Sequence, residues 1–562
     1  GDPNPNPNTN VPPLAQGPPS FAELMAAARG VTPGTAPGHD GLLPEVIVAC
    51  HRAERDAPGA ASNTDPATPL GRALLALAAW IYADPSTCTP LMTGIVVPVP
   101  KKGAPPTPTP GDLRPITLLS TVLNLVSRVV AARLESAIVP LLTPAQAGFR
   151  TTEECVPQAG CLIDGAARRA VKLGRPTWVA FLDLEQAFDR VRHDLLLQRL
   201  ALFGVSGSVL HFIARRYRRA DGSPAGVSRV RAAGALSAPY RVGRGVHQGD
   251  PLSPTLFNVF VNSLFDGLPG AFVPGVGPVP GLLYADDAAI MADSADDLAA
   301  ALAAVDDWCD ASGLALNAAK CKVMVLHGAA PAADGVSPHA AAARVDWRVR
   351  GGAVATTDAF TYLGVPIVPG DVQAAAKAIV DGSLARGRRA LATWGHVLRD
   401  PALHLPVRLL VAKSCVLGAA RYGLDLVGGH GARTLAVFDT FMRDVCRAVV
   451  QPPAHRHNLA YPAMLQELGL PCAMALTRGG TTRLLTKGAS SRTLLAEFVA
   501  SLGTWRQAAR PPHARVYTVT AATWGLFEHM TRCKQDGRPL FAAPAADAAA
   551  LRVPGSAALA PG

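Results

Sequence analysis

Two adjacent carboxylates, Asp286 and Asp287, interrupt an apolar run that reads GLLYADDAAIMAD over residues 281–293. No Lys, Arg or His lies within this run to pair with them. An ionised carboxylate buried without a partner is very costly, so both side chains need a counter-charge from elsewhere. The flanking apolar residues predict two strands joined by a tight hairpin bend at Ala-Asp-Asp-Ala. Taken alone, such a pair is more often a plain polar turn.

Two further Asp pairs lie just downstream and serve as an internal comparison. They are Asp296–Asp297 and Asp306–Asp307, in the segment SADDLAAALAAVDDWCDASG at 294–313. This segment predicts a helix whose apolar stripe contains Leu298, Leu302, Val305 and Cys309. Both pairs fall mostly off that stripe or in the first helical turn, where acids interact favourably with the helix dipole. We therefore interpret them as ordinary solvated or capping residues.

A third acid, Asp183, stands at a place similar to that of Asp286. It lies near the end of TWVAFLDLE, residues 177–185, an apolar run that predicts a buried strand. Carboxylates on neighbouring strand ends can share two divalent cations about 3.5–4 Å apart. Such oxygen-rich sites suit Mg²⁺, which also binds substrate phosphates. The three acids thus predict a two-metal site, in which one ion activates a hydroxyl and the other holds a triphosphate.

The composition narrows the class of protein. The chain has 562 residues, of which 49% are hydrophobic, enough for several domains with real cores. Its net charge of +11 favours a polyanionic partner, with nucleic acid as the first candidate. No uncharged apolar stretch approaches 18 residues, so we expect no membrane span. The ten cysteines form no CxxC pair, so we expect them reduced and mostly buried, although a zinc site built from distant ligands stays open.

The start of the chain does not look like part of a globular domain. The Pro/Asn-rich start at Gly1 predicts a disordered tail or a cut edge, not a signal peptide, and we expect a longer parent product.

The Pro/Thr-rich segment 101–112 predicts a mobile loop between a strand, GIVVPVP, and a helix, STVLNLVSRVVAARL. Another helix is predicted at 253–268, with Ser253 as its cap and Pro254 at its first position.

A series of short blocks resembles, in order, the motifs of reverse transcriptases of non-LTR (LINE-type) retrotransposons. The palm-like blocks are FLDLEQAFDRV, RGVHQGDPLSPTLFNVFVNSL, YADD, GLALNAAKCKVMVL and FTYLGVPI. Upstream blocks of the same kind are APGHDGLLPEVI, VPVPKKG, DLRPITLLS and LTPAQAGFR, and downstream ones are ARYGLDLVGG and YPAMLQELGLP. The resemblance covers roughly residues 30–490. The chain departs from the family pattern at TTEECVPQ, residues 151–158, where many relatives carry a Gly-Arg-Ser-type turn.

The resemblance implies an α+β, right-hand polymerase fold with fingers, a palm with an antiparallel sheet, and a helical thumb. The expected boundaries are a tail at 1–29, an N-terminal extension and fingers at 30–176, a palm at 177–372 with some fingers elements near 204–243, a thumb at 373–500, and an unassigned tail at 501–562. The implied activity is RNA-directed DNA synthesis from dNTPs, with an RNA template and a DNA primer. The implied setting is a nuclear or cytoplasmic retrotransposon ribonucleoprotein.

For the catalytic centre, the resemblance assigns both metals to Asp183 and Asp286, with Asp287 assisting. The ions would be two Mg²⁺, with Mn²⁺ as an alternative. Lys320 matches the lysine proposed to protonate the pyrophosphate leaving group. A plain surface lysine in NAAKCK is an equal interpretation of that residue.

For the incoming nucleotide, Phe188 matches the aromatic gate that excludes a ribose 2′-hydroxyl, although without the resemblance it would be interpreted as a core residue. Gln248 and Gly249 match a contact to nucleotide and template, with a plain loop as the alternative. The fingers residues that hold the triphosphate correspond to Arg114 together with Lys101 or Lys102. At least one of these lysines is better interpreted as a solvated loop residue.

For the primer and the duplex, Tyr362, Leu363 and Gly364 resemble the hairpin that grips the primer end. Residues 373–456 contain twelve Lys and Arg against five Asp and Glu, which favours phosphate contacts in the thumb. The cluster ARRYRRA at 214–220 adds a second basic segment. A helix with a solvated basic face remains the alternative for these charges.

Two other hypotheses remain. In the first, the chain is a decayed or domesticated copy that binds RNA or DNA without polymerising. In the second, it is a polymerase that works on another template or in another setting, such as an intron maturase. The presence of all three acids with Phe188 and Gln248 counts against decay. The block at 36–47 and the YGLDLVGG region favour the retrotransposon over the maturase. We find no nuclease motif and no convincing ribonuclease H acid cluster in residues 500–562.

Overall fold

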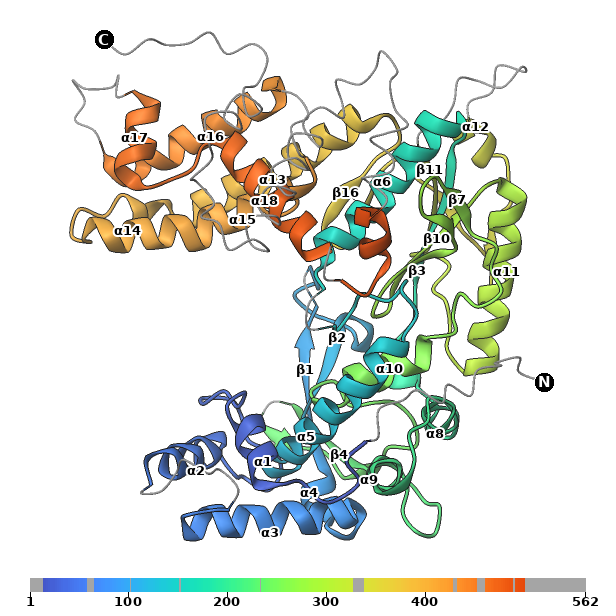
Figure 1. Ribbon diagram of the computed structural model, residues 1–562, viewed down its shortest axis with the longest axis vertical. Helices are drawn as coiled ribbons and strands as arrows, with labels where there is room; N and C mark the ends of the chain where they lie inside the picture. The colour runs from blue at the N-terminus through green and yellow to red at the C-terminus, as the bar shows by residue number, and fades with distance from the viewer. Residues whose placement is uncertain are drawn as a thin grey trace, which may run out of the picture. The chain divides into compact units, whose positions relative to one another are not determined.

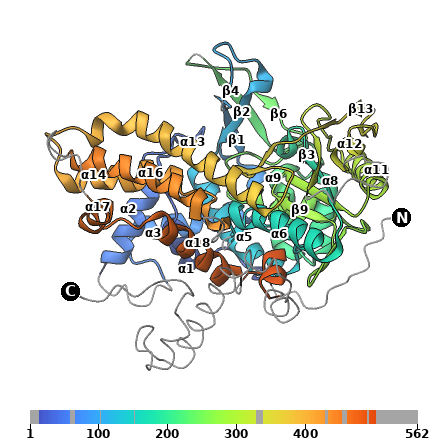
Figure 2. The ribbon, with the colours of Figure 1, turned by 90° about the horizontal axis from the view of Figure 1, so that it is seen from above.

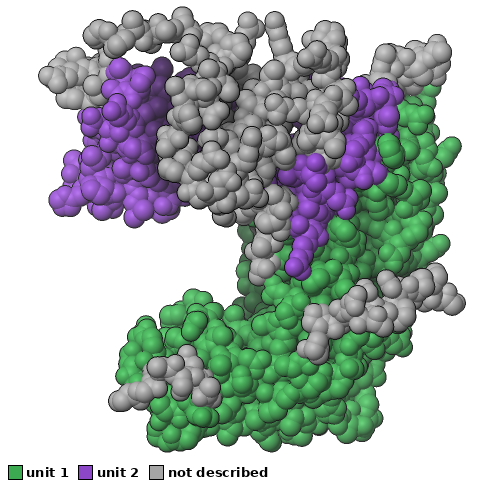
Figure 3. Space-filling view, viewed as in Figure 1, with its two compact units in different colours: residues 1–155, 175–272, 278–357 green, residues 156–174, 273–277, 358–562 purple. Residues whose placement is uncertain are grey.

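The computed structural model describes residues 14–57, 65–101, 103–150, 153–232, 234–326, 338–427, 432–451, 460–488 and 491–500. The chain forms two compact units, shown in different colours in Figure 3. The first unit comprises residues 1–155, 175–272 and 278–357, and the second comprises 156–174, 273–277 and 358–562. Residues 1–13 of the expected tail at 1–29, the expected tail at 501–562 and the candidate Lys102 lie outside the described residues, and residues Phe21–Ala28 within the first of these tails form a helix. The domain boundaries given above remain predictions.

The central sheet of the first unit has five strands in the order β14-β11-β3-β10-β9. Their bounds are β3 Thr177–Asp183, β9 Gly281–Tyr284, β10 Asp287–Ala292, β11 Lys322–Leu326 and β14 Ala355–Thr356. The middle strand β3 runs antiparallel to both β10 and β11, and only the β11–β14 pair is parallel. Residues Thr177–Leu182 of β3 are buried, as its continuous apolar sequence predicts. The antiparallel palm sheet expected from the sequence is therefore present.

One long helix, α11 (Ala295–Ser312), packs against β3 and β10 (Figure 1). The helix begins after Ser294, whose side chain accepts a hydrogen bond from the backbone N–H of Asp297 at 3.1 Å. It ends at Gly313, which adopts the left-handed conformation with φ 76°. Its apolar stripe is buried as predicted, and Asp296 and Asp297 lie in its first turn. These two acids are ordinary first-turn residues, as the sequence indicates.

A second sheet of the first unit has the order β2-β1-β4-β5, with β6 also paired to β4. Its strands are β1 Thr93–Pro100, β2 Leu113–Leu118, β4 Val227–Ala232, β5 Ala235–Leu236 and β6 Tyr240–Arg241. Figure 2 shows β1, β2 and β4 together. The sequence interpretation missed β2, because Pro115 and the short run LRPITL hide a strand. Residues 101–112 therefore connect two strands of a hairpin and do not lead directly into the helix.

Helices make up most of the rest of the first unit. They are α1 Phe21–Ala28, α2 Pro44–Asp56, α3 Pro69–Ala83, α4 Thr89–Met92, α5 Thr121–Ile138, α7 Ala187–Arg190, α8 His193–Leu202, α9 Gly207–Tyr217, α10 Ser253–Val261 and α12 Pro338–Ala342. The predicted cap of α10 is wrong, since the N-cap is Leu252 and Ser253 is already helical with no capping hydrogen bond. The helix also ends earlier than predicted, at Val261 instead of 268.

The second unit is mainly helical. Its elements are α6 Cys155–Leu173, α13 Val372–Leu398, α14 Leu405–Val411, α15 Gly418–Ala420, α16 Ala432–Val450, α17 Tyr461–Leu468 and α18 Ala473–Gly488, with the hairpin of β15 Phe360–Tyr362 and β16 Val365–Ile367. The long helix α13 packs against α14, α15 and α16. Its amino end is capped by Asp371, whose side chain accepts from the N–H of Ala374 at 2.9 Å.

The α+β fold class is confirmed by these sheets and helices. The nine described cysteines are all free, and five of them are buried, as expected. No helix within the described ranges is long and apolar enough to cross a membrane.

Candidate active site

The backbone positions of the three predicted metal-binding acids lie at one edge of the central sheet. Asp287, the first residue of β10, is the cross-strand partner of Asp183, the last residue of β3. Asp287 also pairs with Tyr284 of β9, so Ala285 and Asp286 form the two-residue turn between β9 and β10. The predicted hairpin at Ala-Asp-Asp-Ala is confirmed. Asp183 and Asp286 are half-buried and Asp287 is exposed, so the cluster is not sealed inside the protein.

A buried amide holds the turn that carries Asp286. Ala285 has a positive φ of 58°, which is strained for a residue with a Cβ. The side-chain Oε1 of Gln146 accepts hydrogen bonds from the backbone N–H of Ala285 at 2.9 Å and of Gly148 at 2.8 Å. Gln146 is fully buried. A Cβ on Gly148 would meet the Ala285 nitrogen at 2.2 Å, so only glycine permits this close approach.

Burial and neighbouring negative charges raise the pKa of two acids of the cluster, Asp286 and Asp287. Burial raises the pKa of Asp286, with a further contribution from the Asp183 charge, while Arg114 opposes the shift. The pKa of Asp287 rises to about 6, chiefly by desolvation and then by the charges of Asp286 and Asp183. The part of each shift that comes from like charges, which is smaller than the part that comes from burial, would be relieved by a nearby cation. The opposing effect of Arg114 places this predicted triphosphate ligand within electrostatic reach of Asp286.

Lys320 lies directly at the cluster. Its Nζ is 3.3 Å from Oδ2 of Asp183, and both side chains are partly exposed. The ammonium therefore supplies the counter-charge for one of the three acids. The backbone N–H of Asp183 also donates to Sγ of the buried Cys321 at 3.4 Å. Lys320 is nevertheless an exposed residue, so its role as a proton donor stays a prediction.

Phe188 packs in a small aromatic group. Its ring stacks on Phe257 with centroids 4.4 Å apart and meets Phe149 edge-on at 6.0 Å. The side chain is half-buried, so one part of the ring packs and the remainder is accessible. This arrangement fixes the ring without hiding it, as a residue that contacts a sugar requires.

The loop with Gln248 and Gly249 is docked on β2. The N–H of Thr117 donates to the carbonyl of Gln248 at 2.7 Å, and a Cβ on Gly249 would meet the Thr117 oxygen at 2.5 Å. Nε2 of Gln248 donates to Oδ2 of Asp189 at 3.5 Å. Asp189 is a residue that the sequence interpretation did not select.

The charge of Lys101, a predicted triphosphate ligand, acts on Asp189. Burial raises its pKa and the Lys101 charge opposes that shift, so Lys101 lies within electrostatic reach. The Nζ of Lys101 donates to the carbonyl of Gly111 at 2.8 Å.

The predicted primer hairpin forms in the second unit. Tyr362 pairs with Val365, which leaves Leu363 and Gly364 as the turn, with φ values of 49° and 77°. Positive φ at both positions is the signature of a type I′ turn. The hydroxyl of Tyr422 donates to the Leu363 carbonyl at 2.6 Å and stabilises this strained residue.

The basic segment 214–220 is not a uniformly solvated or phosphate-facing cluster. Arg216 is 2% exposed and forms a buried ion pair with Asp250, and Arg215 lies 3.2 Å from Asp84. Two of its four arginines thus pair with acids of the protein itself, Arg216 in the interior and Arg215 in a partly exposed ion pair. The interpretation of the whole segment as a phosphate contact is wrong for these two residues.

Two structural contacts were missed from the sequence, those of Gln146 and of Arg216 with Asp250. Asp250 also accepts from the N–H of Leu252 at 3.0 Å and so fixes the exit of the Gln248 loop. The block LTPAQAGFR contains Gln146, but nothing in the local sequence says that its amide faces a turn 139 residues away. The one signal in the sequence is a polar residue placed between two small ones, Ala145 and Ala147, where a buried amide would need a hydrogen-bond partner.

The donor chemistry of the cluster fits Mg²⁺, because three carboxylates offer only oxygen ligands and repel one another without a cation. Among the described residues, no three His, Cys, Asp or Glu side chains converge closely enough to form a metal-binding group. The ion pair of Asp183 with Lys320 directs that carboxylate to an ammonium instead. The metal-binding roles therefore stay a proposal.

A family model and several curated proteins that resemble this chain agree on one family. Residues 99–367 match the family model described as reverse transcriptase (RNA-dependent DNA polymerase). The chain is 31% identical over 221 residues to the Pol polyprotein of type-2 retrotransposable element R2DM of Drosophila melanogaster, covering 39% of this chain and 20% of that protein. It is 29% identical over 306 residues to a Pol polyprotein of a type-1 element R2 of Popillia japonica, covering 53% and 38%. The match agrees with the right-hand polymerase fold predicted above.

The jockey RNA-directed DNA polymerase of Drosophila melanogaster is 27% identical over 277 residues, covering 46% of this chain and 27% of that protein. The chain spans less than two fifths of the length of these relatives. Among solved structures, a telomerase from Candida albicans matches with a TM-score of 0.34 and 11% identity, covering 75% of this chain and 67% of that one.

Proposed function

We propose that this chain, whose residues 99–367 belong to the reverse transcriptase family and are distantly homologous to non-LTR retrotransposon enzymes, is an RNA-directed DNA polymerase. It would add dNTPs to the 3′-hydroxyl of a DNA primer on an RNA template. We place it in a retrotransposon ribonucleoprotein of the nucleus or the cytoplasm.

The observation that carries the proposal is the pairing of Asp183 with Asp287 next to the turn of Asp286. These acids come from segments about a hundred residues apart, and strand pairing brings them to one accessible edge. Asp183 and Asp286 would hold two Mg²⁺ ions, with Asp287 assisting. When bound, such ions lower the pKa of a hydroxyl nucleophile and neutralise triphosphate charge.

The other candidate residues would have separate tasks. Arg114, within electrostatic reach of Asp286, holds the triphosphate, with Lys101 as its partner in the fingers. Lys320, already at Asp183, donates a proton to the departing pyrophosphate. Gln248 and Gly249 position the base pair. The turn at Leu363 and Gly364 holds the primer end, since most of the rate in such reactions comes from placement and charge.

The test is single-nucleotide primer extension on an RNA template with Mg²⁺, comparing wild type with Asp286→Asn. Asparagine keeps the shape and removes the charge, so we expect a loss of about three orders of magnitude or more in rate. The matched control is Asp296→Asn, an exposed aspartate on α11, which should extend normally. Equal extension by wild type and Asp286→Asn would overturn the proposal.

A further inference from the structure

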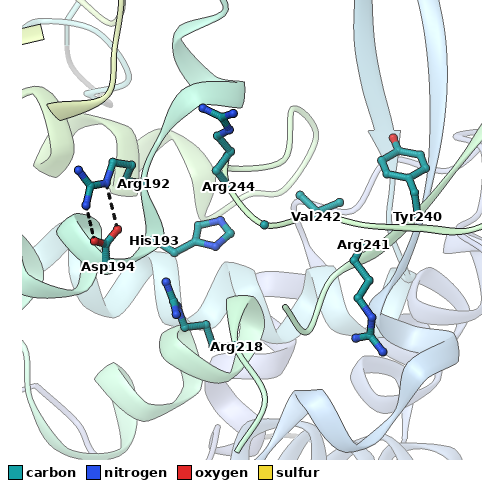
Figure 4. A pocket seen from close by; sticks show the side chains of 9 residues that line it. Arg192, His193, Asp194, Arg218, Tyr240, Arg241, Val242 and Arg244 are labelled. Atoms are coloured by element: carbon teal, nitrogen blue, oxygen red, sulfur yellow. Dashed lines mark hydrogen bonds and ion pairs between the residues drawn. The ribbon is translucent and has the colours of Figure 1, made fainter. Parts of the chain in front are cut away.

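A cavity outside the acid cluster has a strongly basic wall. It has a volume of about 560 Å³, in the range of pockets that bind small ligands. Its wall is formed by residues 192–194 at the start of α8, Arg218 after α9, and residues 240–244 at and beyond β6 (Figure 4). All these residues belong to the first unit. Of these residues, Arg218 lies in the basic segment 214–220 that the sequence analysis singled out, and the others were not assigned a role there.

The charge of this pocket is unbalanced. Four arginines face one acid, Asp194, and that acid is paired with Arg192 at 2.6 Å. Arg241 donates to the carbonyl of Pro224 at 2.8 Å. Within the part of the chain that the structure describes, the guanidinium groups of Arg218 and Arg244 form no hydrogen bond or ion pair, and both residues are exposed. Two unpaired guanidinium groups at one pocket are suited to bind phosphate.

The side chain between Arg218 and Arg244 is that of His193, and it is uncharged. His193 is buried, and Figure 4 shows Arg218 and Arg244 on opposite sides of it. Its Nε2 lies 2.8 Å from the Gly245 carbonyl and must donate to it, so the other ring nitrogen is the unprotonated one in the neutral form. Burial, followed by smaller charge effects that include Arg218, lowers the pKa of His193. The positive charge of the pocket therefore comes from its arginines.

An aromatic ring stands at the same pocket. Tyr240, the first residue of β6, is 45% exposed, so its ring is accessible to a ligand. Proteins that bind single-stranded nucleic acid combine such rings, on which bases stack, with basic grooves that follow the phosphates. A paired duplex cannot offer a base face to Tyr240, whereas an unpaired strand can.

We propose that this pocket binds the phosphate backbone of an unpaired RNA strand, with a base stacked on Tyr240. The identity of the strand rests on the proposed function, in which the unpaired RNA is the template. The backbone connects the pocket to the polymerase residues, because Gly245 and Val246 donate to the carbonyls of Val191 and Phe188, each at 2.8 Å. Gln248 follows Arg244 by four residues, at most about 14 Å of chain. One strand can therefore contact both.

The test measures binding of a labelled 12-nucleotide unpaired RNA by fluorescence anisotropy, without Mg²⁺ or dNTPs, across a salt series. Arg218→Gln/Arg244→Gln should weaken binding at least about tenfold and lower the log–log salt slope by about 1.4, the value for two phosphate contacts to a single strand. Tyr240→Ala should weaken binding several-fold, and Tyr240→Phe should restore it. Because no synthesis is involved, these results are independent of whether the polymerase proposal holds.

The matched control is Arg52→Gln/Arg344→Gln, which removes the same charge from two exposed positions outside the pocket. It should change affinity by less than about threefold. The inference is overturned if both double variants weaken binding equally, or if the pocket variant lowers affinity for a 12-base-pair RNA duplex as much as for the unpaired strand. It is also overturned if free UMP competes with the labelled RNA as well as unlabelled RNA does at the same concentration of phosphate groups. The pocket would then bind free nucleotides. Thermal unfolding of each variant confirms that it is folded.

Discussion

Asp183 and Asp287 are directly opposed across the antiparallel strands β3 and β10, so two carboxylates share one cross-strand site. Like charges in such positions destabilise a sheet. A third carboxylate, Asp286, lies in the adjacent turn and adds to the repulsion. An arrangement that costs folding stability is the kind expected where function needs a cation.

The first prediction concerns the pH dependence of stability. The pKa of Asp287 is about 6 in the folded state against 3.8 for an ordinary Asp, so the folded protein holds this proton more tightly than the unfolded one. Wild-type stability should therefore fall as the pH rises from about 4 to about 6. Asp287→Asn should remove that fall and be more stable at pH 7.5, by on the order of 1 kcal/mol because the exposed side chain is screened by solvent.

Urea unfolding without divalent metal measures this difference. The two proteins should differ least at pH 3.5, where Asp287 of the wild type is mostly protonated in both the folded and the unfolded state. Lower stability of Asp287→Asn at pH 7.5 would show that the carboxylate is favourably paired and not under repulsion.

A second prediction concerns Gln146, which holds the strained Ala285. Gln146→Leu leaves the buried N–H groups of Ala285 and Gly148 without an acceptor, at a cost of about 1–3 kcal/mol for each such group. Displacement of Asp286 should also lower kcat for extension by about tenfold to a hundredfold, with little change in KM for the primer–template. A stability loss with unchanged kcat would make Gln146 a purely structural residue.

Some of this arrangement follows from the sequence and some does not. The apolar run before Asp183, the apolar flanks of Asp286 and the stripe of α11 fix three elements because each buries a continuous or periodic apolar surface. Strand β2 was missed because its burial is partial and its residues alternate poorly. The contact of Gln146 with Ala285 depends on tertiary folding and has no local signature. The carboxylates at two strand ends predict a metal site by themselves, whereas the division of roles among the three acids comes from the family resemblance.

A third prediction concerns the buried ion pair of Arg216 and Asp250, which are 2% and 0% exposed. Arg216→Met leaves the Asp250 carboxylate buried without a partner and should destabilise the protein by about 3–5 kcal/mol. The double variant Arg216→Met/Asp250→Leu should recover most of that loss. A double-mutant cycle by urea unfolding measures the coupling. Additive losses would show that the two charges are stabilised independently.

A fourth prediction concerns sugar selection by Phe188, which is braced against Phe257 at 4.4 Å. Phe188→Ala opens the space of the ring and should increase ribonucleotide incorporation relative to deoxynucleotide, while Phe188→Tyr should keep the preference. Competitive single-nucleotide incorporation gives the ratio. An unchanged ratio in Phe188→Ala, with lower stability, would limit the ring to packing.

The most direct measurement of the central claim is Mn²⁺ binding to the full chain, followed by electron paramagnetic resonance at pH 7.5. Wild type should bind Mn²⁺, Mg²⁺ should compete for the same sites, and Asp183→Asn/Asp286→Asn should lose that binding. The matched control Asp296→Asn/Asp307→Asn removes two exposed aspartates from α11 and should bind as the wild type does. Equal Mn²⁺ binding by both double variants would contradict the assignment of Asp183, Asp286 and Asp287 as the metal centre.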